Sequence, residues 1–380
     1  MITKENKFIQ LILIILGVFL LSGCNTNQNL SDFECLPTQK SFSYPVDTWT
    51  GKPTPTLVSP NYNSWQLQLR DQRLSNPSQV IARGDDQIWM LDQNMMLYTK
   101  NDKQLKQYFI TRNGEMDTPQ TLFLSKDGTL WAMGSRSGIE GPLLSRYNDK
   151  TDKFETIIDS GKLLQFDGSG GGEITEDSNN RLWFVLYGYG VYVFDPKNNS
   201  AKKILSQDLA DGSIIVSIAV DSKDGLWLGT QTKTFGNDLV YYDTKTLILS
   251  NLFLRINEEE PIRGLLIDNN NRLWISDYAY WIIGTPLPTE DRMGINLIIR
   301  SPVFISQHSP RSDYAWLRPK VLIEDSDGNI WYTSFGLVRF NPKIGEWCKV
   351  FDSDALEIGV TEDNQGYFWT VTDGKLYNHN

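Results

Sequence analysis

A short polar turn that runs into an apolar residue and then a Trp recurs seven times along this chain. The copies end at Trp89, Trp131, Trp183, Trp227, Trp274, Trp331 and Trp369. Consecutive Trp residues lie 38 to 57 positions apart, a period that suits one small antiparallel sheet per repeat. A single unit of this length cannot bury its own apolar faces, so neighbouring units must stack against one another.

The turns themselves follow a common pattern. Five copies begin with an acidic residue six positions before the Trp: Asp177, Asp221, Asp268, Asp325 and Asp363. In the first two copies Arg83 and Ser125 occupy that position. Asp, Asn and Gly fill the turns, and these residues tolerate positive φ angles and hydrogen-bond to their own backbone. Each turn is therefore predicted to join the first two strands of its unit.

Apolar runs on either side of the turns supply the strands. The segment 214–220 precedes one turn, and 336–342 follows another as a third strand. These runs show little apolar/polar alternation, which is typical of sheets covered on both faces. We therefore predict an all-β fold, a seven-bladed β-propeller of four-stranded antiparallel blades.

Counting strands predicts how the ring closes. The seventh unit has three expected strands, at 355–361, 367–372 and 375–377, before the chain stops at Asn380. A strand left at a sheet edge invites aggregation. Because residues 65–70 alternate like a strand, we expect this N-terminal segment to complete the last blade.

The N-terminus carries an export pattern. Lys4 and Lys7 precede an apolar stretch at 8–21, which is shorter than the roughly 20 residues that span a bilayer. The Leu-Ser-Gly sequence before Cys24 resembles the bacterial lipobox, which implies that Cys24 is lipidated, and Asn25 after it favours the outer membrane in a cell that has one. A plain signal peptide and a short uncleaved anchor are the alternatives.

These features divide the chain into three parts. Residues 1–23 are predicted to be a lipoprotein signal peptide, 24–63 a polar, Pro-rich tether, and 64–380 the propeller. The expected location is the cell envelope, on the extracytoplasmic side and anchored by acyl chains, at the outer membrane or the cell surface.

Charge and cysteine content narrow the function. The chain has 36 Lys and Arg against 46 Asp and Glu, a net charge of −10. An acidic chain without a basic run argues against nucleic acid as a partner and against electrostatic docking on anionic lipid. Beyond Cys24 only Cys35 and Cys348 remain. They form one disulfide in an oxidising compartment or remain two thiols.

The turn followed by Leu-Trp, together with the Gly-Leu-Val-Arg-Phe-Asn-Pro strand at 336–342, resembles the two-component regulator propeller repeat. The resemblance covers about 76–380. It implies an extracytoplasmic sensing ring, like those of hybrid histidine kinases, and a relation to streptogramin lyases. No transmembrane helix, kinase module or DNA-binding pattern follows the ring in this sequence. We therefore expect any signal to pass to another protein.

Catalysis is not expected. The resemblance to streptogramin lyases implies a His general base, but the chain has only His308, in a Pro-interrupted stretch, and His379, where chain ends fray. The turn at 325–328 begins like a calcium loop, yet Gly336 holds the position of the closing acid. We therefore predict a non-catalytic binding or sensing module without cofactor or metal. A lyase-like enzyme and a structural envelope scaffold are the alternatives.

Strand order assigns the connections between second and third strands, and those between units, to one face of the ring. Long loops on a rigid scaffold are where recognition residues concentrate. The candidate binding residues on this face are Arg136, Glu140, Tyr187, Tyr189, Arg263, Asp277, Tyr278, Tyr280, Trp281, Arg311, Tyr314 and Trp316. Aromatic and charged side chains of this kind suit a protein or glycan partner. The alternative is that the aromatic side chains cap cores between units.

Overall fold

A computed structural model of the chain describes residues 65–74, 77–91, 95–112, 115–136, 140–159, 172–187, 189–206, 214–231, 239–252, 262–277, 281–286, 298–300, 320–333, 336–343, 346–353, 355 and 358–379. The regular secondary structure of these residues consists of β-strands alone. The predicted signal peptide, tether, lipidated Cys24 and Cys35 lie outside the described residues.

No helix within the described part of the chain has the length and apolarity needed to cross a membrane.

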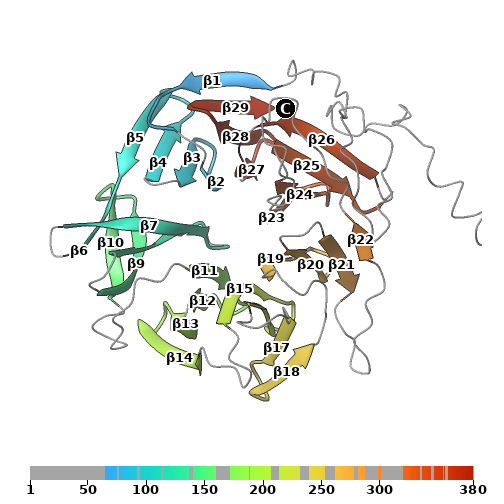
Figure 1. Ribbon diagram of the computed structural model, residues 1–380. Helices are drawn as coiled ribbons and strands as arrows, with labels where there is room; N and C mark the ends of the chain where they lie inside the picture. The colour runs from blue at the N-terminus through green and yellow to red at the C-terminus, as the bar shows by residue number, and fades with distance from the viewer. Residues whose placement is uncertain are drawn as a thin grey trace, which may run out of the picture.

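The described strands form seven antiparallel sheets arranged in a ring (Figure 1). Six sheets have four strands each, as expected. The first three of these six contain, in hydrogen-bonded order, β2 (Gln79–Arg83), β3 (Gln87–Leu91), β4 (Met95–Thr99) and β5 (Gln104–Tyr108); β11 (Gly172–Glu176), β12 (Leu182–Leu186), β13 (Gly190–Asp195) and β14 (Ser200–Ser206); and β15 (Ile214–Val220), β16 (Leu226–Gln231), β17 (Leu239–Asp243) and β18 (Ile248–Leu252).

The other three four-stranded sheets contain, in the same order, β19 (Ile262–Ile267), β20 (Arg272–Asp277), β21 (Trp281–Pro286) and β22 (Ile298–Arg300); β23 (Lys320–Glu324), β24 (Ile330–Thr333), β25 (Gly336–Asn341) and β26 (Glu346–Asp352); and β27 (Val360–Glu362), β28 (Phe368–Thr372), β29 (Lys375–His379) and β1 (Gln66–Arg70).

One sheet departs from the expected four strands. It contains β7 (Glu115–Leu124), β8 (Leu130–Arg136), β9 (Glu140–Asn148) and β10 (Lys153–Asp159), with β6 (Ile110–Arg112) as a fifth strand. The first residues of β7 extend past β8 and pair with β6 instead. The prediction of four strands is therefore wrong for this unit. β6 pairs antiparallel with the start of β7. Ile110 and Asp117, which lie opposite each other in this pair, are buried, whereas Met116 is exposed.

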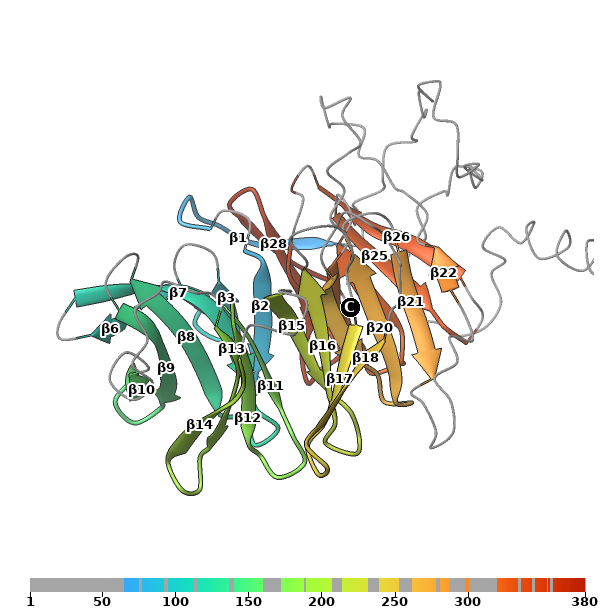
Figure 2. The same cartoon turned by 60° about the horizontal axis from the view of Figure 1, so that its bottom comes forward.

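The innermost strands surround a common axis. Each of β2, β7, β11, β15, β19, β23 and β27 contacts the corresponding strand of the next sheet, and β27 contacts β2 to complete the circle. Figure 2 shows the same sheets turned by 60° about the horizontal axis. The result is a closed ring of twisted sheets, each with neighbours on both faces.

Register divides the ring into two faces. In the sheet β11–β14, Glu176 pairs with Leu182 at the end where the Asp-containing turn lies. At the other end Gly172 pairs with Leu186, which pairs in turn with Gly190. We call the first end the turn face and the second, where connections between second and third strands and between sheets lie, the loop face.

The repeat Trp side chains fill the spaces between sheets. All seven are at most 4% exposed. Trp131 contacts Phe194 of the next sheet with ring centroids 5.8 Å apart, and Trp274 contacts Phe340 at 5.6 Å. Burial of such large aromatic surfaces is the main stabilising contribution at each joint.

A buried carboxylate links each complete turn to its Trp. In the third unit, Oδ1 of Asp177 accepts backbone N–H groups of residues 179 and 181, and Oδ2 accepts the indole N–H of Trp183 at 2.8 Å. The same three bonds recur at Asp221, Asp268, Asp325 and Asp363. In the second unit, Ser125 replaces the carboxylate with its hydroxyl, 2.9 Å from the Trp131 indole nitrogen. The spacing from Asp to Trp is thus set by hydrogen bonding.

The turns are also tied to one another around the ring. The residue after the repeat Asp donates its backbone N–H to a side chain of the next sheet. Ser178 donates to Asp224, Asn269 to Glu324 and Ser326 to Glu362, at 2.6 to 2.8 Å. Burial raises the pKa of Glu324, although the N–H of Asn269 lowers it. These bonds join neighbouring sheets at three places on the turn face.

Pairing of β1 with β29 closes the ring, which confirms the closure predicted from residues 65–70. The indole N–H of Trp65 donates to the carbonyl of Val350 in the neighbouring sheet at 2.9 Å. Its ring packs against Phe351 and His379, with centroids 5.1 and 5.3 Å away. His379 is 4% exposed, so the expected fraying of the C-terminus is wrong.

Removal of the Trp65 side chain tests the closure of the ring. We expect Trp65→Ala to lower the free energy of unfolding by about 3 to 5 kcal/mol, because the indole fills a core between sheets and leaves a cavity. Leu67→Ala is the control, because Leu67 lies on the same strand but is 42% exposed. Urea unfolding followed by Trp fluorescence measures both variants. If Trp65→Ala and Leu67→Ala lowered the free energy of unfolding by the same small amount, closure through β1 would be contradicted.

A second tie, which joins the last sheet to the neighbour on its other side, predicts a pH dependence. Lys100 Nζ lies 2.9 Å from Asp363 Oδ2, with both side chains largely buried. Burial raises the pKa of Asp363, but hydrogen bonds from Lys100, Trp369 and the turn backbone outweigh it and leave the pKa below its ordinary value of 3.8. At pH values above 3.8 the ionised carboxylate of Asp363 therefore stabilises the folded state. This stabilisation is lost as the pH falls through the lowered pKa of Asp363.

We expect Lys100→Met to cost about 2 kcal/mol near neutral pH, because it leaves a buried carboxylate without its cation. The difference between parent and variant should shrink as the pH falls below about 3.8. Urea midpoints at several pH values measure this, with Lys153→Met, at an exposed position, as control. A difference that stays constant down to acid pH would contradict the proposed linkage.

Candidate functional site: the loop face

Several predicted binding residues lie at the strand ends that form the loop face. Arg136 ends β8 and pairs with Glu140, which begins β9. Asp277 ends β20 and Trp281 begins β21. These are connections between second and third strands in two sheets. Arg263 lies near the start of an innermost strand, β19, at the same end of its sheet.

Other predicted residues cannot be placed. Tyr278, Tyr280, Arg311, Tyr314 and Trp316 lie outside the described residues, as does most of the irregular stretch 276–320 to which they belong. The residues that are placed come from three sheets, β7–β10, β11–β14 and β19–β22, of which the first two are neighbours.

Tyr187 and Tyr189 occupy the tight connection between β12 and β13. The N–H of Tyr189 donates to the carbonyl of Leu186 at 2.8 Å. Gly190 follows with φ +112°, where a Cβ would lie 2.0 Å from the carbonyl oxygen of Leu205. Gly336, at the same position of a later sheet, has the same φ and a similar close approach. The backbone of this connection is therefore fixed by the need for glycine.

The two tyrosines of this connection differ in burial. Tyr187 is 38% exposed, so its ring is accessible to solvent. Tyr189 is half-buried against the core cluster that contains Trp131 and Phe184. Tyr189 therefore covers a core between sheets, whereas Tyr187 lies at the surface of the loop face.

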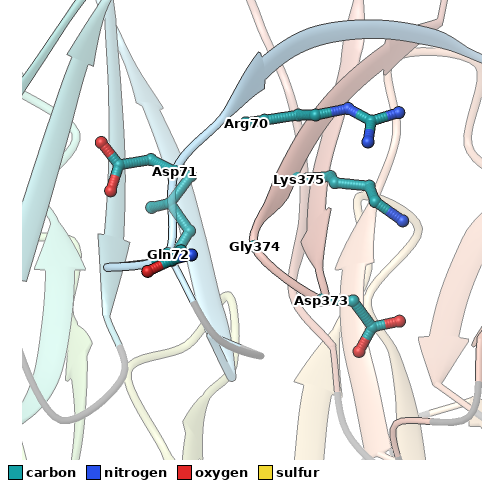
Figure 3. A pocket seen from close by; sticks show the side chains of 7 residues that line it. Arg70, Asp71, Gln72, Asp373, Gly374 and Lys375 are labelled. Carbon is teal, nitrogen blue, oxygen red and sulfur yellow. The ribbon is translucent and has the colours of Figure 1, made fainter.

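A hollow on the loop face involves residues that sequence reasoning missed. It lies where β1 ends and β29 begins, and it is lined by Arg70, Asp71, Gln72, Leu74, Asp373, Gly374 and Lys375. Arg70 pairs with Lys375, and the two side chains extend in the same direction from their strands (Figure 3). The backbone N–H of Asp71 donates to the carbonyl of Gly374 at 2.9 Å, which holds the two chain segments together.

Both signs of charge line this hollow. A hydrogen bond from Arg73 holds the pKa of Asp71 below its usual value, so Asp71 is ionised at neutral pH. Arg70 and Lys375 supply two cations, and Asp373 a second carboxylate. Such a site can contact charged and hydrogen-bonding groups of a polar ligand. The signal that could have identified it is the predicted closure, since placing 65–70 beside 375–377 brings Arg70 close to Lys375.

Among the described residues, the loop face contains neither His residue nor the calcium-like turn at 325–328. His308 lies outside the described residues, and His379 packs against Trp65. Within the described ranges, no three His, Cys, Asp or Glu side chains group as ligands for one ion. At 325–328 both oxygens of Asp325 accept N–H groups, so this turn is structural.

No protein-family model matches the sequence, and no curated protein matches it either. Similar solved structures include the extracellular domain of the one-component system BT4673 from B. thetaiotaomicron, at 21% identity and TM-score 0.40, covering 80% of this chain and 40% of that one. PorZ, an essential bacterial surface component of the type-IX secretion system of Porphyromonas gingivalis, has 12% identity and TM-score 0.53, covering 80% and 46%.

The WD40 β-propeller domain of Doa1 has 13% identity and TM-score 0.57, covering 83% of this chain and 95% of that one. This chain thus spans less than half the length of the BT4673 and PorZ structures. At these identities the similarity shows the fold alone, and that fold is a β-propeller.

Substitution of two glycines, one of them on the loop face, tests whether close backbone approach fixes the connection between β12 and β13. We expect Gly190→Ala to destabilise the protein by more than about 3 kcal/mol, because the added Cβ meets backbone that cannot move without breaking the β13–β14 pairing. Gly84→Ala, at φ +59° with nothing near its Cβ, should cost only about 1 kcal/mol. Thermal unfolding of both variants distinguishes the two. Similar midpoints would contradict the close approach at Gly190.

Proposed function

We propose that this protein is a lipid-anchored, extracytoplasmic β-propeller that binds a protein or glycan partner on its loop face and has no catalytic centre. The lipobox-like sequence at Cys24 supports the anchor. The resemblance of the turns and the 336–342 strand to two-component regulator propellers supports a sensing role. PorZ, which shares the fold, is a bacterial surface component, and such a location suits an exported ring.

We also infer that the ring is a seven-bladed propeller, in which the five-stranded sheet counts as one blade. Contact between successive innermost strands supports this inference, because each sheet has one neighbour on either side. The extra strand β6 is added beyond β7, so it leaves the order of β7 to β10 unchanged.

One observation supports the binding role above the others: accessible recognition groups occur on the same face of a rigid ring. Tyr187 is exposed there on a glycine-fixed connection, and the charged hollow at Arg70 and Lys375 opens at the closure of the ring. Trp281, at the start of β21, adds an aromatic position at the same strand end of another sheet. Aromatic and Arg side chains are enriched at interfaces, where they supply much of the binding energy.

Glycan and peptide arrays probed with the purified protein test this role. We expect Tyr187→Ala, Trp281→Ala and Lys375→Ala to weaken binding to any array ligand about tenfold or more, as loss of an interface anchor does. Lys150→Ala, an exposed change on the turn face, should bind like the parent. Binding that survives all three loop-face changes but is lost in Lys150→Ala would place the site on the opposite face.

The anchor is tested separately. Growth with a palmitate analogue should label the parent protein, and Cys24→Ser should abolish both the label and membrane retention, because the acyl chains are attached to that thiol. Labelling that is unchanged in Cys24→Ser would contradict lipidation at this site, whatever the arrays show.

A further inference from the structure

The outer strand β18 differs from the other outer strands of the ring. It lies at the rim in Figure 1 and has the sequence Ile-Leu-Ser-Asn-Leu, without a charged residue. Each of the other six outer strands carries at least one charge: Arg70 in β1, Lys106 in β5, Lys153 in β10, Lys202 in β14, Arg300 in β22 and Glu346 in β26. Charges on edge strands prevent pairing with other chains, and β18 lacks this protection.

Apolar side chains are exposed at the beginning of this strand. Leu247 is 69% exposed, Ile248 59% and Leu249 37%. Three consecutive exposed aliphatic residues are unusual on a soluble surface, whereas isolated ones are common. Nothing else described in the ring combines three such neighbours.

Leu247 also adopts a backbone conformation that bulky residues avoid. Its φ is +62°. The residues that immediately precede three other outer strands have similar positive φ values, and they are polar: Lys103, Asp152 and Asn199. A branched apolar residue is strained in this region, where Asn or Gly is favoured. An exposed Leu at this strained position suggests that its side chain has a use outside the folded monomer.

The strand also has an open edge. β18 pairs with β17 along one side, and none of the described strands pairs with its other side. The backbone N–H and C=O groups of an open edge can form a ladder with another strand.

We propose that β18 is the interface between two copies of this chain, paired antiparallel about a two-fold axis at Leu249. In this register Ile248 lies opposite Ser250, and Leu247 opposite Asn251, so the paired stretch contains no charge. A two-fold interface places a surface against itself, which requires self-complementary chemistry. Self-pairing of β14 would instead bring Lys202 and Lys203 near their own copies, and like charges across strands repel.

The resulting dimer joins two four-stranded sheets into one continuous sheet of eight strands. Leu247 from each copy would cover the ends of the paired strands, and Leu249 would meet its own copy at the centre. Because a single strand pair buries little surface, the dimer is expected to be weak and concentration-dependent. The loop face stays accessible, so this inference does not depend on the proposed partner.

Sedimentation velocity of the purified full-length chain in non-ionic detergent, from about 1 to about 200 µM, tests the proposal. The parent should shift from monomer to dimer across this range. Leu249→Lys should weaken dimerisation about tenfold or more, because it places two cations at the axis. Leu67→Lys is the matched control: Leu67 is an exposed Leu on another outer strand, 42% against 37% for Leu249. It should dimerise like the parent.

Leu247→Asn separates association from folding. Asn accepts positive φ more readily than Leu, so this variant should unfold at a higher urea concentration than the parent while dimerising more weakly. A loss of dimer in this variant cannot then be explained by misfolding.

Oxidation of Leu249→Cys provides a second measurement. Residues directly opposite in an antiparallel pair are close enough for a disulfide, so Leu249→Cys should form a covalent dimer that reductant reverses, beyond the background of the native cysteines. Leu67→Cys should remain at that background. A parent that stays monomeric at every concentration, equal dimerisation of parent and Leu249→Lys, or equal crosslinking at positions 67 and 249 would each overturn the proposal.

Discussion

In this ring the two ends of the chain share one sheet, because β1 pairs with β29, and the rest of the structure depends on that pairing. β29 would present an open edge if β1 did not cover it. The indole of Trp65 and the Lys100–Asp363 ion pair hold the junction on either side. Because the ring is closed, each sheet has two neighbours, and the turn and loop faces become continuous surfaces.

The repeat unit depends on a second interaction that is local. One carboxylate oxygen of the repeat Asp fixes the turn, and the other holds the indole of the Trp six residues later. This bond sets the orientation of the largest core side chain, so local turn geometry and packing between sheets are determined together. The Ser125–Trp131 bond shows that a hydroxyl can replace one of the two carboxylate functions.

Much of this architecture could be predicted from the sequence, because periodicity and strand counting report on local structure. The turns, the strand meanders and the role of residues 65–70 follow from such patterns. The added strand β6 could not be predicted in the same way, since only three residues pair and the pairing begins inside a longer strand. Bonds such as Ser178 to Asp224 were also missed, because they join residues of different repeats.

The same limits apply to the candidate site. Tyr187 could be placed on the loop face from strand order alone, but its exposure and the burial of Tyr189 depend on packing against the neighbouring sheet. The hollow between Arg70 and Lys375 depends on residues from opposite ends of the chain, which meet only after closure. The proposed recognition on the loop face and the proposed self-pairing at β18 involve separate surfaces, so the two can operate together.

Native-state hydrogen exchange at β29 tests the central claim most directly. In a closed ring the amides of Leu376 and Tyr377 are part of a covered strand and should exchange only through global unfolding, as slowly as those of Val191 and Val193 in β13. Much faster exchange in β29 than in β13, at the same pH and temperature, would contradict a ring closed by the N-terminal strand.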